Sequence, residues 1–425
     1  MASGDALFQS VGIASIGIVG ANIAGASTAE TLRRLGYDGR IVLIGAEREL
    51  PYERPPLSKE YLAGQFDEDR LTLRPPQFYE EQRIELWLGQ HVTALDAPTR
   101  TVILAGGEHH SFDRVVLATG SELVPLPVPG ADLPGVYSLR TLADGRALLA
   151  ALRAGASHHG RVVVIGAGFI GCEVAATCRM AGMDVTLIEM LPTPMERALG
   201  PEMGALLAEV HRAHGVDLRT SETVTAIEGA ERAEVVVTGK GARIPCEFVV
   251  IGTGVRPATQ WLASSGLALA NGVLVDTTCE SSAPGIFAAG DVANWPYQPA
   301  ESVPAQRVRL EHWDNALRQG ETVARNLLGA GVAYRHIPYF WSDQYDLKLQ
   351  YVGYTPAWDQ IVMRGTPPES FTAFYLMAGR VRAALSSNRV RDLVTLKKLV
   401  GAAPMLPEAA LADDQQPLKN LLKAV

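Results

Sequence analysis

A glycine pattern that occurs twice constrains the fold of this chain more strongly than any other feature. In its complete form, an apolar strand predicted over residues 161–165 leads into the sequence GAGFIG of residues 166–171. A predicted helix follows, and a second strand over 184–188 ends on Glu189. Strand, G-x-G-x-x-G turn, helix, strand and a terminal acidic residue are the signature of a dinucleotide-binding βαβ unit.

Each residue type in this turn has a physical role. Gly166 permits the tight turn, Gly168 lets a pyrophosphate approach the backbone, and Gly171 lets the helix pack closely on the strand. The helix begins near Phe169 and Ile170, where N-terminal N–H groups and a partial positive charge favour phosphate. We therefore expect a dinucleotide to bind here.

The end of the second strand predicts which nicotinamide nucleotide binds. Glu189 can accept hydrogen bonds from an adenosine ribose 2′-OH, whereas a 2′-phosphate would meet its carboxylate. This favours NADH over NADPH, although Arg197 is near enough in sequence to keep NADPH open. Another apolar strand, over 248–251, runs into glycines, and we include Gly254 in the predicted NAD site.

An incomplete copy of the pattern occurs near the beginning of the chain. A strand over 15–19, the turn GANIAG of residues 20–25, a helix to about residue 35 and a strand over 40–45 repeat the same order. Asn22 replaces the middle glycine and brings a Cβ and an amide to the point of closest phosphate approach. Taken alone, the turn fits a nucleotide site and an ordinary strand-to-helix turn equally. If it binds a nucleotide, we expect a slightly longer approach or an added hydrogen bond from Asn22.

The composition argues against several other classes of protein. The chain has 425 residues, enough for two or three domains, and a formal charge of −8, unlike a typical nucleic-acid-binding protein. Its four cysteines form no C-x-x-C pair, so we expect reduced and mostly buried thiols in a cytoplasmic protein. Residues 11–29 are uncharged but contain Gly, Ser, Asn and Thr, and we expect neither a signal peptide nor a membrane helix there.

No metal site is expected. The histidine pairs at 109–110 and 158–159 look like loop residues, and His211 and His214 are expected on an exposed helix. No carboxylate or cysteine ligand set accompanies them. The Ala- and Pro-rich residues 404–425 are expected to form a loosely packed terminus.

Further motifs surround the two glycine turns. They are PPLSK (55–59), ATG (118–120), LRTL (139–142), GAGFIGCE (166–173), Gly290-Asp291 and FWSDQ (340–344). With them, the chain resembles the NADH-dependent ferredoxin and rubredoxin reductases of the putidaredoxin reductase type, which are flavoproteins with two dinucleotide-binding domains. The resemblance spans about residues 15–400.

The resemblance implies an α/β fold, glutathione-reductase-like, with two Rossmann-like domains and a C-terminal α+β domain. It divides the chain into an FAD-binding domain of residues 15–123 and 248–329, an NAD-binding domain of residues 124–247, and an interface domain of residues 330–425.

It also implies that the first turn binds FAD and the second NADH. Glu47 is the expected acceptor for the FAD ribose, although the family's acid can fall one residue earlier, at Ala46. Asp291 would bind the ribityl hydroxyls, and a helix beginning near Trp313 would stabilise negative charge on the flavin. The other expected FAD contacts are Gly20, Asn22, Ala24, Gly25, Arg54, Lys59, Val92, Thr119, Gly120 and Arg140.

The implied chemistry is hydride transfer from nicotinamide to flavin, followed by release of single electrons. Lys59 and Glu173 resemble the family's catalytic pair at the flavin edge. Related disulfide reductases carry a cysteine near the flavin, but no cysteine precedes Cys172 here. Electrons should therefore leave for an external acceptor, a [2Fe–2S] ferredoxin or a rubredoxin that serves a cytochrome P450 or a dioxygenase.

Two other functions remain open from sequence: an NADH oxidase or diaphorase, and a flavin-binding interaction protein of the apoptosis-inducing-factor kind. An acidic ferredoxin needs a basic docking surface. We expect it among Arg74, Lys348, Arg389, Lys397 and Lys398. The protein is expected to be a monomer or homodimer that binds neither nucleic acid nor membrane.

Overall fold

The computed structural model describes residues 12–424. Their contacts divide the chain into two compact units. The first unit takes in the chain up to Glu53, together with Asp69–Glu122 and Arg256–Phe340, and the second contains Arg54–Glu68, Leu123–Val255 and Trp341–Val425. The chain passes between the units within or beside five short elements, which are η1 (Pro55–Ser58), α2 (Glu68–Leu71), β8 (Ser121–Leu123), β17 (Val255–Pro257) and β22 (Tyr339–Gln344). The division into three domains stays a prediction.

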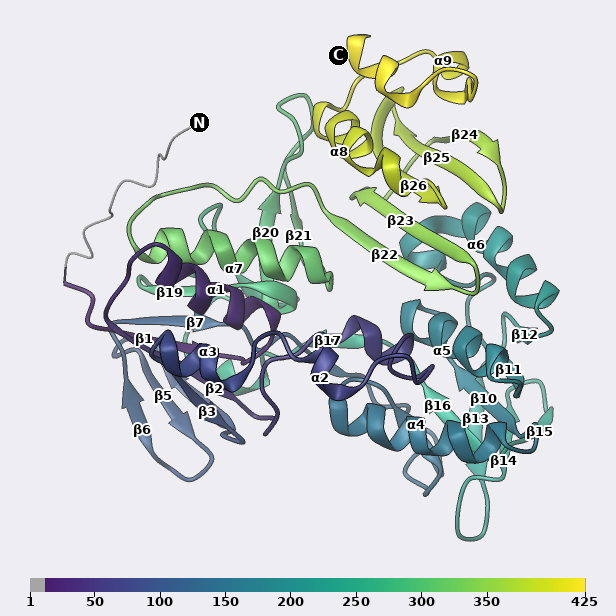
Figure 1. Ribbon diagram of the computed structural model, residues 1–425, viewed down its shortest axis with the longest axis horizontal. Coiled ribbons are helices and arrows are strands. Elements are labelled where there is room, and N and C mark those ends of the chain that lie inside the picture. Colours follow the sequence, from purple (N-terminus) through teal and green to yellow (C-terminus); the bar gives the residue numbers. More distant parts are fainter. Residues whose placement is uncertain (1–11, 425) are drawn as a thin grey trace. The chain divides into compact units, whose positions relative to one another are not determined.

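The first unit is built on a five-stranded parallel sheet in the order β19-β7-β1-β2-β3 (Figure 1). Apolar side chains fill its strands, and Ile16 and Ile18 of the central strand are fully buried. A strand buried on both faces reads as a continuous apolar run, which is the pattern that predicted β1 and β2. The strands are β1 (Ser15–Val19), β2 (Arg40–Gly45), β3 (Ile84–Leu88), β7 (Arg114–Leu117) and β19 (Ile286–Ala288).

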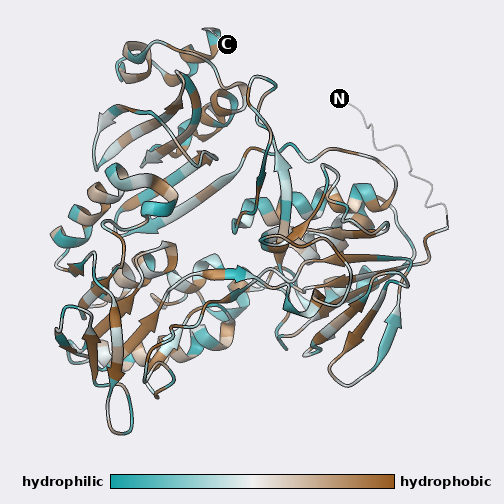
Figure 2. Ribbon diagram, turned by 180° about the vertical axis from the view of Figure 1, so that it is seen from behind, coloured by the Kyte–Doolittle hydropathy of each residue, from teal (hydrophilic) through white to brown (hydrophobic). Residues whose placement is uncertain are grey.

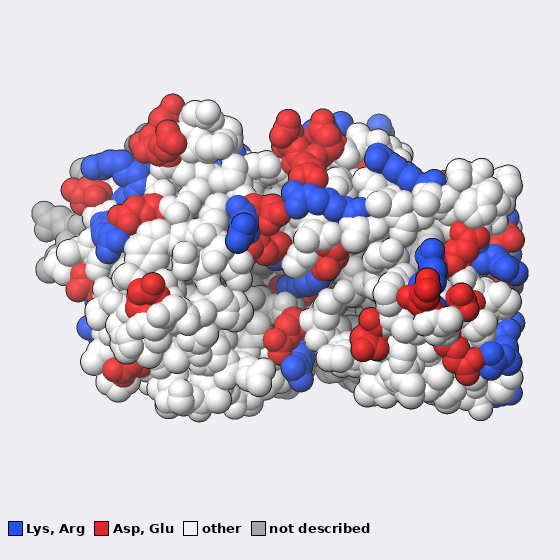
Figure 3. All heavy atoms as spheres, turned by 90° about the horizontal axis from the view of Figure 1, so that it is seen from below, with Lys and Arg blue, Asp and Glu red and all other residues white. Residues whose placement is uncertain are grey.

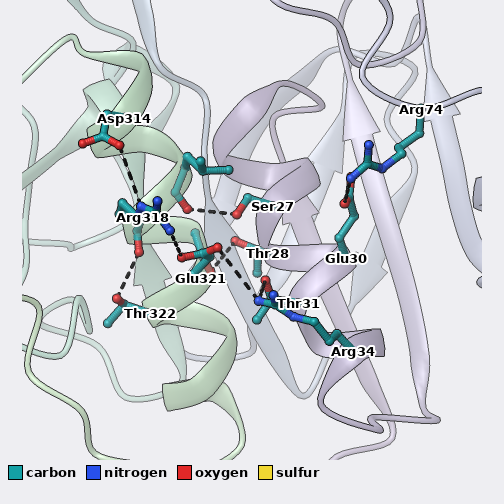
Figure 4. Close-up of polar contacts among 12 residues, drawn as sticks. Ser27, Thr28, Glu30, Thr31, Arg34, Arg74, Asp314, Arg318, Glu321 and Thr322 are labelled. Carbon is teal, nitrogen blue, oxygen red and sulfur yellow. Dashed lines mark hydrogen bonds and ion pairs between the residues drawn. The ribbon is translucent and has the colours of Figure 1, made fainter. Parts of the chain in front are cut away.

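Two helices of the first unit, α1 (Ile23–Arg34) and α7 (Trp313–Leu327), pack against each other at close range (Figure 4). A Cβ at Gly320 would lie 2.5 Å from the carbonyl oxygen of Ala24, so only glycine permits this approach. Ser27 Oγ donates to the carbonyl of Leu317 at 2.9 Å, and Thr28 Oγ1 donates to that of Gly320 at 3.2 Å. The contact fixes the beginning of α7 relative to the first glycine turn.

Smaller elements complete the first unit. The antiparallel strands β4 (Val92–Asp96), β5 (Thr101–Leu104) and β6 (His109–Ser111) form one sheet, and β18 (Val273–Leu274), β20 (Ala293–Tyr297) and β21 (Gln306–Val308) form another. The helices are α3 (Pro76–Glu81), η2 (Gln260–Leu262) and η3 (Gly290–Val292). The prediction that His109 and His110 lie in a loop is wrong: both are in β6, where the ring of His110 packs on Trp87 at 4.5 Å.

The second unit contains another five-stranded parallel sheet, in the order β12-β11-β10-β16-β9. Its strands are β9 (Val136–Ser138), β10 (Arg161–Ile165), β11 (Asp184–Ile188), β12 (Asp217–Arg219) and β16 (Phe248–Ile251). The helices are η1 (Pro55–Ser58), α4 (Leu142–Ala156), α5 (Phe169–Met180) and α6 (Glu196–Ala213), and a small antiparallel sheet contains β13 (Val224–Glu228), β14 (Val235–Thr238) and β15 (Arg243–Pro245). The predicted α/β fold class is confirmed.

The later part of the chain forms an antiparallel sheet in the order β22-β23-β26-β25-β24. Its remaining strands are β23 (Leu347–Gly353), β24 (Gln360–Thr366), β25 (Ser370–Met377) and β26 (Arg380–Ser387). The helices after it are η4 (Val390–Asp392), α8 (Leu393–Ala402), α9 (Glu408–Ala412) and η5 (Leu418–Ala424). Apolar residues concentrate in the strands of the two parallel sheets (Figure 2).

The prediction of a loosely packed C-terminal segment is wrong. Leu406, Leu411 and Leu418 are buried. The guanidinium of Arg364, only 3% exposed, forms an ion pair with Asp414 at 3.3 Å and donates to backbone carbonyls of the same segment. Within residues 12–424, no helix is long and apolar enough to cross a bilayer.

Candidate functional site

At two positions of the first glycine turn, any residue other than glycine would clash with the neighbouring backbone. Gly20 has a φ of +121°, and a Cβ there would lie 2.1 Å from the carbonyl oxygen of Ala118. A Cβ at Gly25 would lie 2.0 Å from the carbonyl oxygen of Gly20. The turn therefore brings the end of β1, the beginning of α1 and the residue after β7 into direct contact.

Asn22 is the N-cap of α1. Its side-chain oxygen accepts a hydrogen bond from the N–H of Ile23 at 2.8 Å, which satisfies one donor of the helix terminus. Its Nδ2 atom is buried and has no hydrogen-bond partner among the described residues. A buried donor without a partner is costly, so an anion at this terminus would satisfy it. The turn therefore fits a pyrophosphate.

Several other residues predicted for this site come shortly after a parallel strand in the sequence. Thr119 and Gly120 follow β7, Glu47 follows β2, and Asp291 follows β19. Since the carboxyl ends of parallel strands meet at one edge of a sheet, these residues share the edge at which such folds bind ligands. Val92 is the first residue of β4.

Hydrogen bonds hold these side chains in place. Tyr52 OH donates to Glu47 Oε2 at 2.7 Å, and Ser121 Oγ donates to Asp291 Oδ2 at 2.6 Å. Thr119 Oγ1 donates to the carbonyl of Ala258 at 3.1 Å. Ser121 and Tyr52 were not predicted; Ser121 directly follows the ATG motif, which is the one sequence signal that points to it.

The second turn repeats the steric arrangement of the first. A Cβ at Gly166, which has a φ of +97°, would lie 2.4 Å from the carbonyl oxygen of Gly252, and one at Gly171 would lie 1.8 Å from that of Gly166. At Gly168, by contrast, a Cβ would meet nothing within 4 Å. Gly168 is the N-cap of α5, and no side chain caps that helix. The space beside this helix terminus fits a phosphate group.

Glu189 is fixed at the end of β11 and is only 9% exposed. Its Oε2 accepts a hydrogen bond from the N–H of Ala167 at 2.7 Å, and its Oε1 accepts one from Leu191 at 2.8 Å. The carboxylate therefore braces the glycine turn and keeps lone pairs for a ribose hydroxyl. Arg197 is exposed on α6, and Gly254 has a φ of +101°.

Lys59 and Glu173 form a buried ion pair within the second unit. Lys59 Nζ lies 2.8 Å from Glu173 Oε2, and the two side chains are 10% and 3% exposed. Lys59 Nζ also donates to the carbonyl of Pro55 at 2.7 Å. Ser58 Oγ donates to Glu173 Oε2, and Ser342 Oγ donates to Glu173 Oε1 at 2.7 Å. The carboxylate therefore has three donors from two segments far apart in sequence.

Two models of known families match the chain. The pyridine nucleotide-disulphide oxidoreductase model matches residues 14–320, and the reductase C-terminal model matches residues 339–422. The first match covers both glycine turns, Lys59 and Glu173. The chain belongs to the pyridine nucleotide-disulphide oxidoreductase family.

Full-length relatives define the branch of the family. The ferredoxin reductase subunit of the 5,5′-dehydrodivanillate O-demethylase of Sphingobium sp. is 41% identical over 96% of this chain and 98% of its own. Putidaredoxin reductase of Pseudomonas putida is 36% identical over 96% of each chain. The ferredoxin reductase for the CYP199A2 system from Rhodopseudomonas palustris has a TM-score of 0.90 and 38% identity, and covers 96% of this chain and 99% of its own. The chain is a reductase of the putidaredoxin reductase type, for which a nicotinamide nucleotide and a flavin are the cofactors.

The cysteines of this reductase are all free and buried, as predicted. Burial raises the pKa of the Cys178 thiol to about 12 and that of the Cys246 thiol to about 11. Burial also raises the pKa of Cys172 and Cys279 strongly. Thiols in this state are poor nucleophiles, so none of them is suited to a dithiol relay.

The prediction that His211 lies on an exposed helix face is wrong. His211 is on α6 but is fully buried, because Gln344 and Tyr345 of the antiparallel sheet cover it. Burial lowers the pKa of His211 to about 4. His214, which directly follows the last residue of α6, is exposed. The described residues contain no cluster of three or more His, Cys, Asp or Glu that could hold a metal ion.

Two predicted flavin contacts, Arg54 and Arg140, lie in the second unit, where the Arg54 guanidinium donates to the carbonyl of Arg140. The N–H of Arg140 in turn donates to Asp144, which forms the capping box of α4.

The residues predicted to dock a partner are divided between the two units. Lys348 and Lys398 are exposed in the second unit, Lys397 is half-buried, and Arg389 is held by two hydrogen bonds to Asp414 at 2.6 and 2.8 Å. Arg74 belongs to the first unit, where it pairs with Glu30 at 3.0 Å (Figure 4). Charges of both signs are interspersed on the face drawn in Figure 3.

Proposed function

We propose that this protein is an FAD-dependent NADH:ferredoxin oxidoreductase that supplies electrons to an oxygenase, either a cytochrome P450 or a dioxygenase. The observation that carries the proposal is the full-length similarity to ferredoxin reductase components of oxygenase systems, at 41% identity for the Sphingobium relative. The buried state of all four thiols supports an external acceptor rather than an internal dithiol.

In this proposal the first unit binds FAD. Gly20, Ala24 and Gly25 would contact the pyrophosphate, Asn22 Nδ2 would donate to it, and Glu47 would accept from the adenosine ribose. Thr119, Gly120 and Asp291 would contact the flavin and its ribityl chain, and the N-terminus of α7 at Trp313 would favour negative charge on the flavin. When bound, the flavin accepts a hydride equivalent from NADH and gives up electrons singly.

The second glycine turn would bind NADH. Gly168 leaves room for the pyrophosphate, and the N-terminus of α5 supplies backbone donors and positive potential. The buried carboxylate of Glu189 would accept from the ribose 2′-OH and would repel a 2′-phosphate. This supports a preference for NADH over NADPH.

Lys59 and Glu173 would order the nicotinamide pocket. Their pairing at 2.8 Å holds the ammonium in one position, and the hydroxyls of Ser58 and Ser342 hold the carboxylate. Fixed charges in a site that excludes water stabilise developing charge without a reorganisation cost. The pair would therefore act through position and electrostatics rather than as a nucleophile.

A ferredoxin or rubredoxin would be the electron acceptor. Lys348, Lys397 and Lys398 are the basic side chains of the second unit that remain candidates for docking, because Arg389 is committed to Asp414. We place the reductase in the cytoplasm as part of this proposal, since reduced thiols are typical of that compartment.

The proposal is tested on the purified protein. The cofactor is released and identified by mass, and the protein is titrated anaerobically with NADH and, in parallel, with NADPH. The reduced protein is then mixed with a panel of [2Fe–2S] ferredoxins and rubredoxins, with ferricyanide as a control acceptor. We expect FAD, reduction by NADH in preference to NADPH, and rapid reduction of at least one iron–sulfur protein. Fast reaction with oxygen but with no iron–sulfur protein would indicate an oxidase instead, and failure to oxidise NADH would indicate an interaction protein.

A further inference from the structure

A continuous chain of hydrogen bonds connects Glu173 with the surface of the second unit. Ser342 Oγ donates to Glu173 Oε1 at 2.7 Å, and Gln344 Nε2 lies 3.1 Å from Ser342 Oγ. Gln344 Oε1 lies 3.1 Å from His211 Nε2, and His211 Nδ1 lies 3.0 Å from Tyr345 OH. Ser342 and His211 are fully buried, and Gln344 is 1% exposed.

The outer end of the chain lies at a pocket. The ring of Tyr345 stacks on that of His214, with centroids 3.7 Å apart. Both rings line an open pocket of about 520 Å³, together with His159, Arg179 and Asp184. Tyr345 thus joins this surface to the buried histidine.

The chemistry of each group fixes the direction of the chain. Glu173 is an acceptor, so Ser342 must donate to it and must itself accept from the amide of Gln344. The amide oxygen then faces His211 Nε2, which must carry the hydrogen. His211 Nδ1 is left as an acceptor for the hydroxyl of Tyr345. Every donor in the chain therefore points toward Glu173.

The neutral form of His211 is consistent with this arrangement. Burial lowers its pKa, and nearby His214 lowers it further, while the hydrogen bond to Gln344 acts in the opposite direction. Among the described residues, the groups that contact or face the ring are Tyr345, Gln344 and His214, and none of them is a carboxylate. A neutral imidazole with a single N–H serves as donor on one side and acceptor on the other.

We propose that Ser342, Gln344, His211 and Tyr345 are positioning residues that hold the Glu173 carboxylate in the geometry required for its pairing with Lys59. This inference rests on the proposed function of the Lys59–Glu173 pair. Aligned hydrogen-bond dipoles in a buried site reinforce one another, so the chain stabilises negative charge at Glu173. It is unsuited to conducting protons, because the Gln344 amide in its middle does not readily accept and release one.

The first test measures the protonation state of His211, which shows the direction of the hydrogen-bond chain, and it requires no turnover. In holoprotein labelled with ¹⁵N-histidine, the resonances of His211 are assigned by comparison with the His211→Gln variant. We expect a neutral imidazole protonated on Nε2 throughout the range from pH 6 to 8. A ring protonated on Nδ1, or a charged ring at neutral pH, would overturn the proposed direction.

The second test separates positioning from folding. For His211→Leu and Ser342→Ala we expect the Kd for NADH to stay within about twofold of the wild-type value. The limiting rate of NADH oxidation with ferricyanide should fall about tenfold, which corresponds to an increase of about 1.4 kcal/mol in the activation free energy. His211→Gln, whose amide can still donate to Gln344, should recover most of the rate. Tyr345→Phe, which keeps the stacked ring, should lose less than His211→Leu.

The matched control is Ser265→Ala, which removes a buried serine hydroxyl of the first unit that bonds only to backbone groups. It should leave both the Kd and the rate unchanged. Equal losses in binding and rate, or a rate for Ser342→Ala equal to wild type, would overturn the proposal. Because ferricyanide replaces the protein acceptor, a failure of ferredoxin reduction would not affect this result.

Discussion

The buried pair of Lys59 and Glu173 makes a quantitative prediction about stability. The two side chains are 10% and 3% exposed, so neither charge can be solvated when its partner is removed. Removing one member of such a pair costs about 3–5 kcal/mol, mostly because the remaining charge stays buried. In Glu173→Gln, the new amide hydrogens would also face the donors Ser58 and Lys59. We expect this variant to lose about 3 kcal/mol of unfolding free energy.

The reciprocal change should cost somewhat less. In Lys59→Met the Glu173 carboxylate keeps the hydroxyl donors of Ser58 and Ser342, so we expect a loss of about 2–3 kcal/mol. The double variant no longer buries an unpaired charge. Its loss should be close to that of one single variant, which gives a coupling free energy of about 2–3 kcal/mol between the two residues.

The assay is urea-induced unfolding of the four holoproteins, followed by circular dichroism, with the slope of each transition compared before the midpoints are interpreted. A surface pair such as Arg40 and Glu85, which are 47% and 45% exposed, serves as the control and should couple by less than about 1 kcal/mol. If the losses of unfolding free energy in the two single variants sum to the loss in the double variant within about 0.5 kcal/mol, the reasoning is refuted, because additivity indicates independent sites.

Three further predictions follow from other parts of the structure. The folded pKa of His211 is about 4, below its ordinary 6.5, so the stability that its neutral form contributes is fully present above pH 6.5 and is lost as the pH falls toward 4. Between pH 6.5 and pH 4, chemical denaturation should show that wild type loses up to about 3 kcal/mol of unfolding free energy from this group and that His211→Gln loses less. An equal loss in both proteins would contradict this prediction. Asn22→Gly should weaken retention of FAD about tenfold, as measured by release during dialysis against denaturant-free buffer, since a charge-assisted hydrogen bond is lost; tighter retention would show that Asn22 is a cost. Reversing Lys397 and Lys398 to Glu should weaken ferredoxin reduction and its dependence on salt but leave ferricyanide reduction unchanged, whereas an equal loss with both acceptors would argue against docking at α8.

The parallel strands and their glycine turns could be predicted almost to the residue. Strands β1, β2, β10 and β11 begin and end where the sequence placed them, because buried parallel strands are short apolar runs bounded by glycine. For Asn22 the sequence predicted either a longer phosphate approach or an added hydrogen bond, and this stays a prediction; its N-cap geometry follows from the known preference of Asn at that position.

The contacts that surround Glu173 could not be predicted. Ser58 and Ser342 both lie within recognised motifs, but their meeting at one carboxylate depends on how η1, α5 and β22 pack. Tertiary packing also explains why His211 was wrongly predicted to be exposed. The residues that cover it come from β22 and the turn after it, and the helical pattern of α6 is interrupted at Gly200. In residues 404–425, the widely spaced Leu406, Leu411 and Leu418 gave no periodic signal, although each of the three is buried.

The stoichiometry of electron transfer tests the central claim most directly. The purified holoprotein is mixed anaerobically with an excess of an oxidised [2Fe–2S] ferredoxin and a limiting, known amount of NADH, and cluster reduction is followed optically. The proposed function predicts that each NADH consumed yields two reduced ferredoxins, with no reaction when the protein is omitted. NADH consumed without reduced clusters, or clusters that stay oxidised while NADH persists, would contradict it.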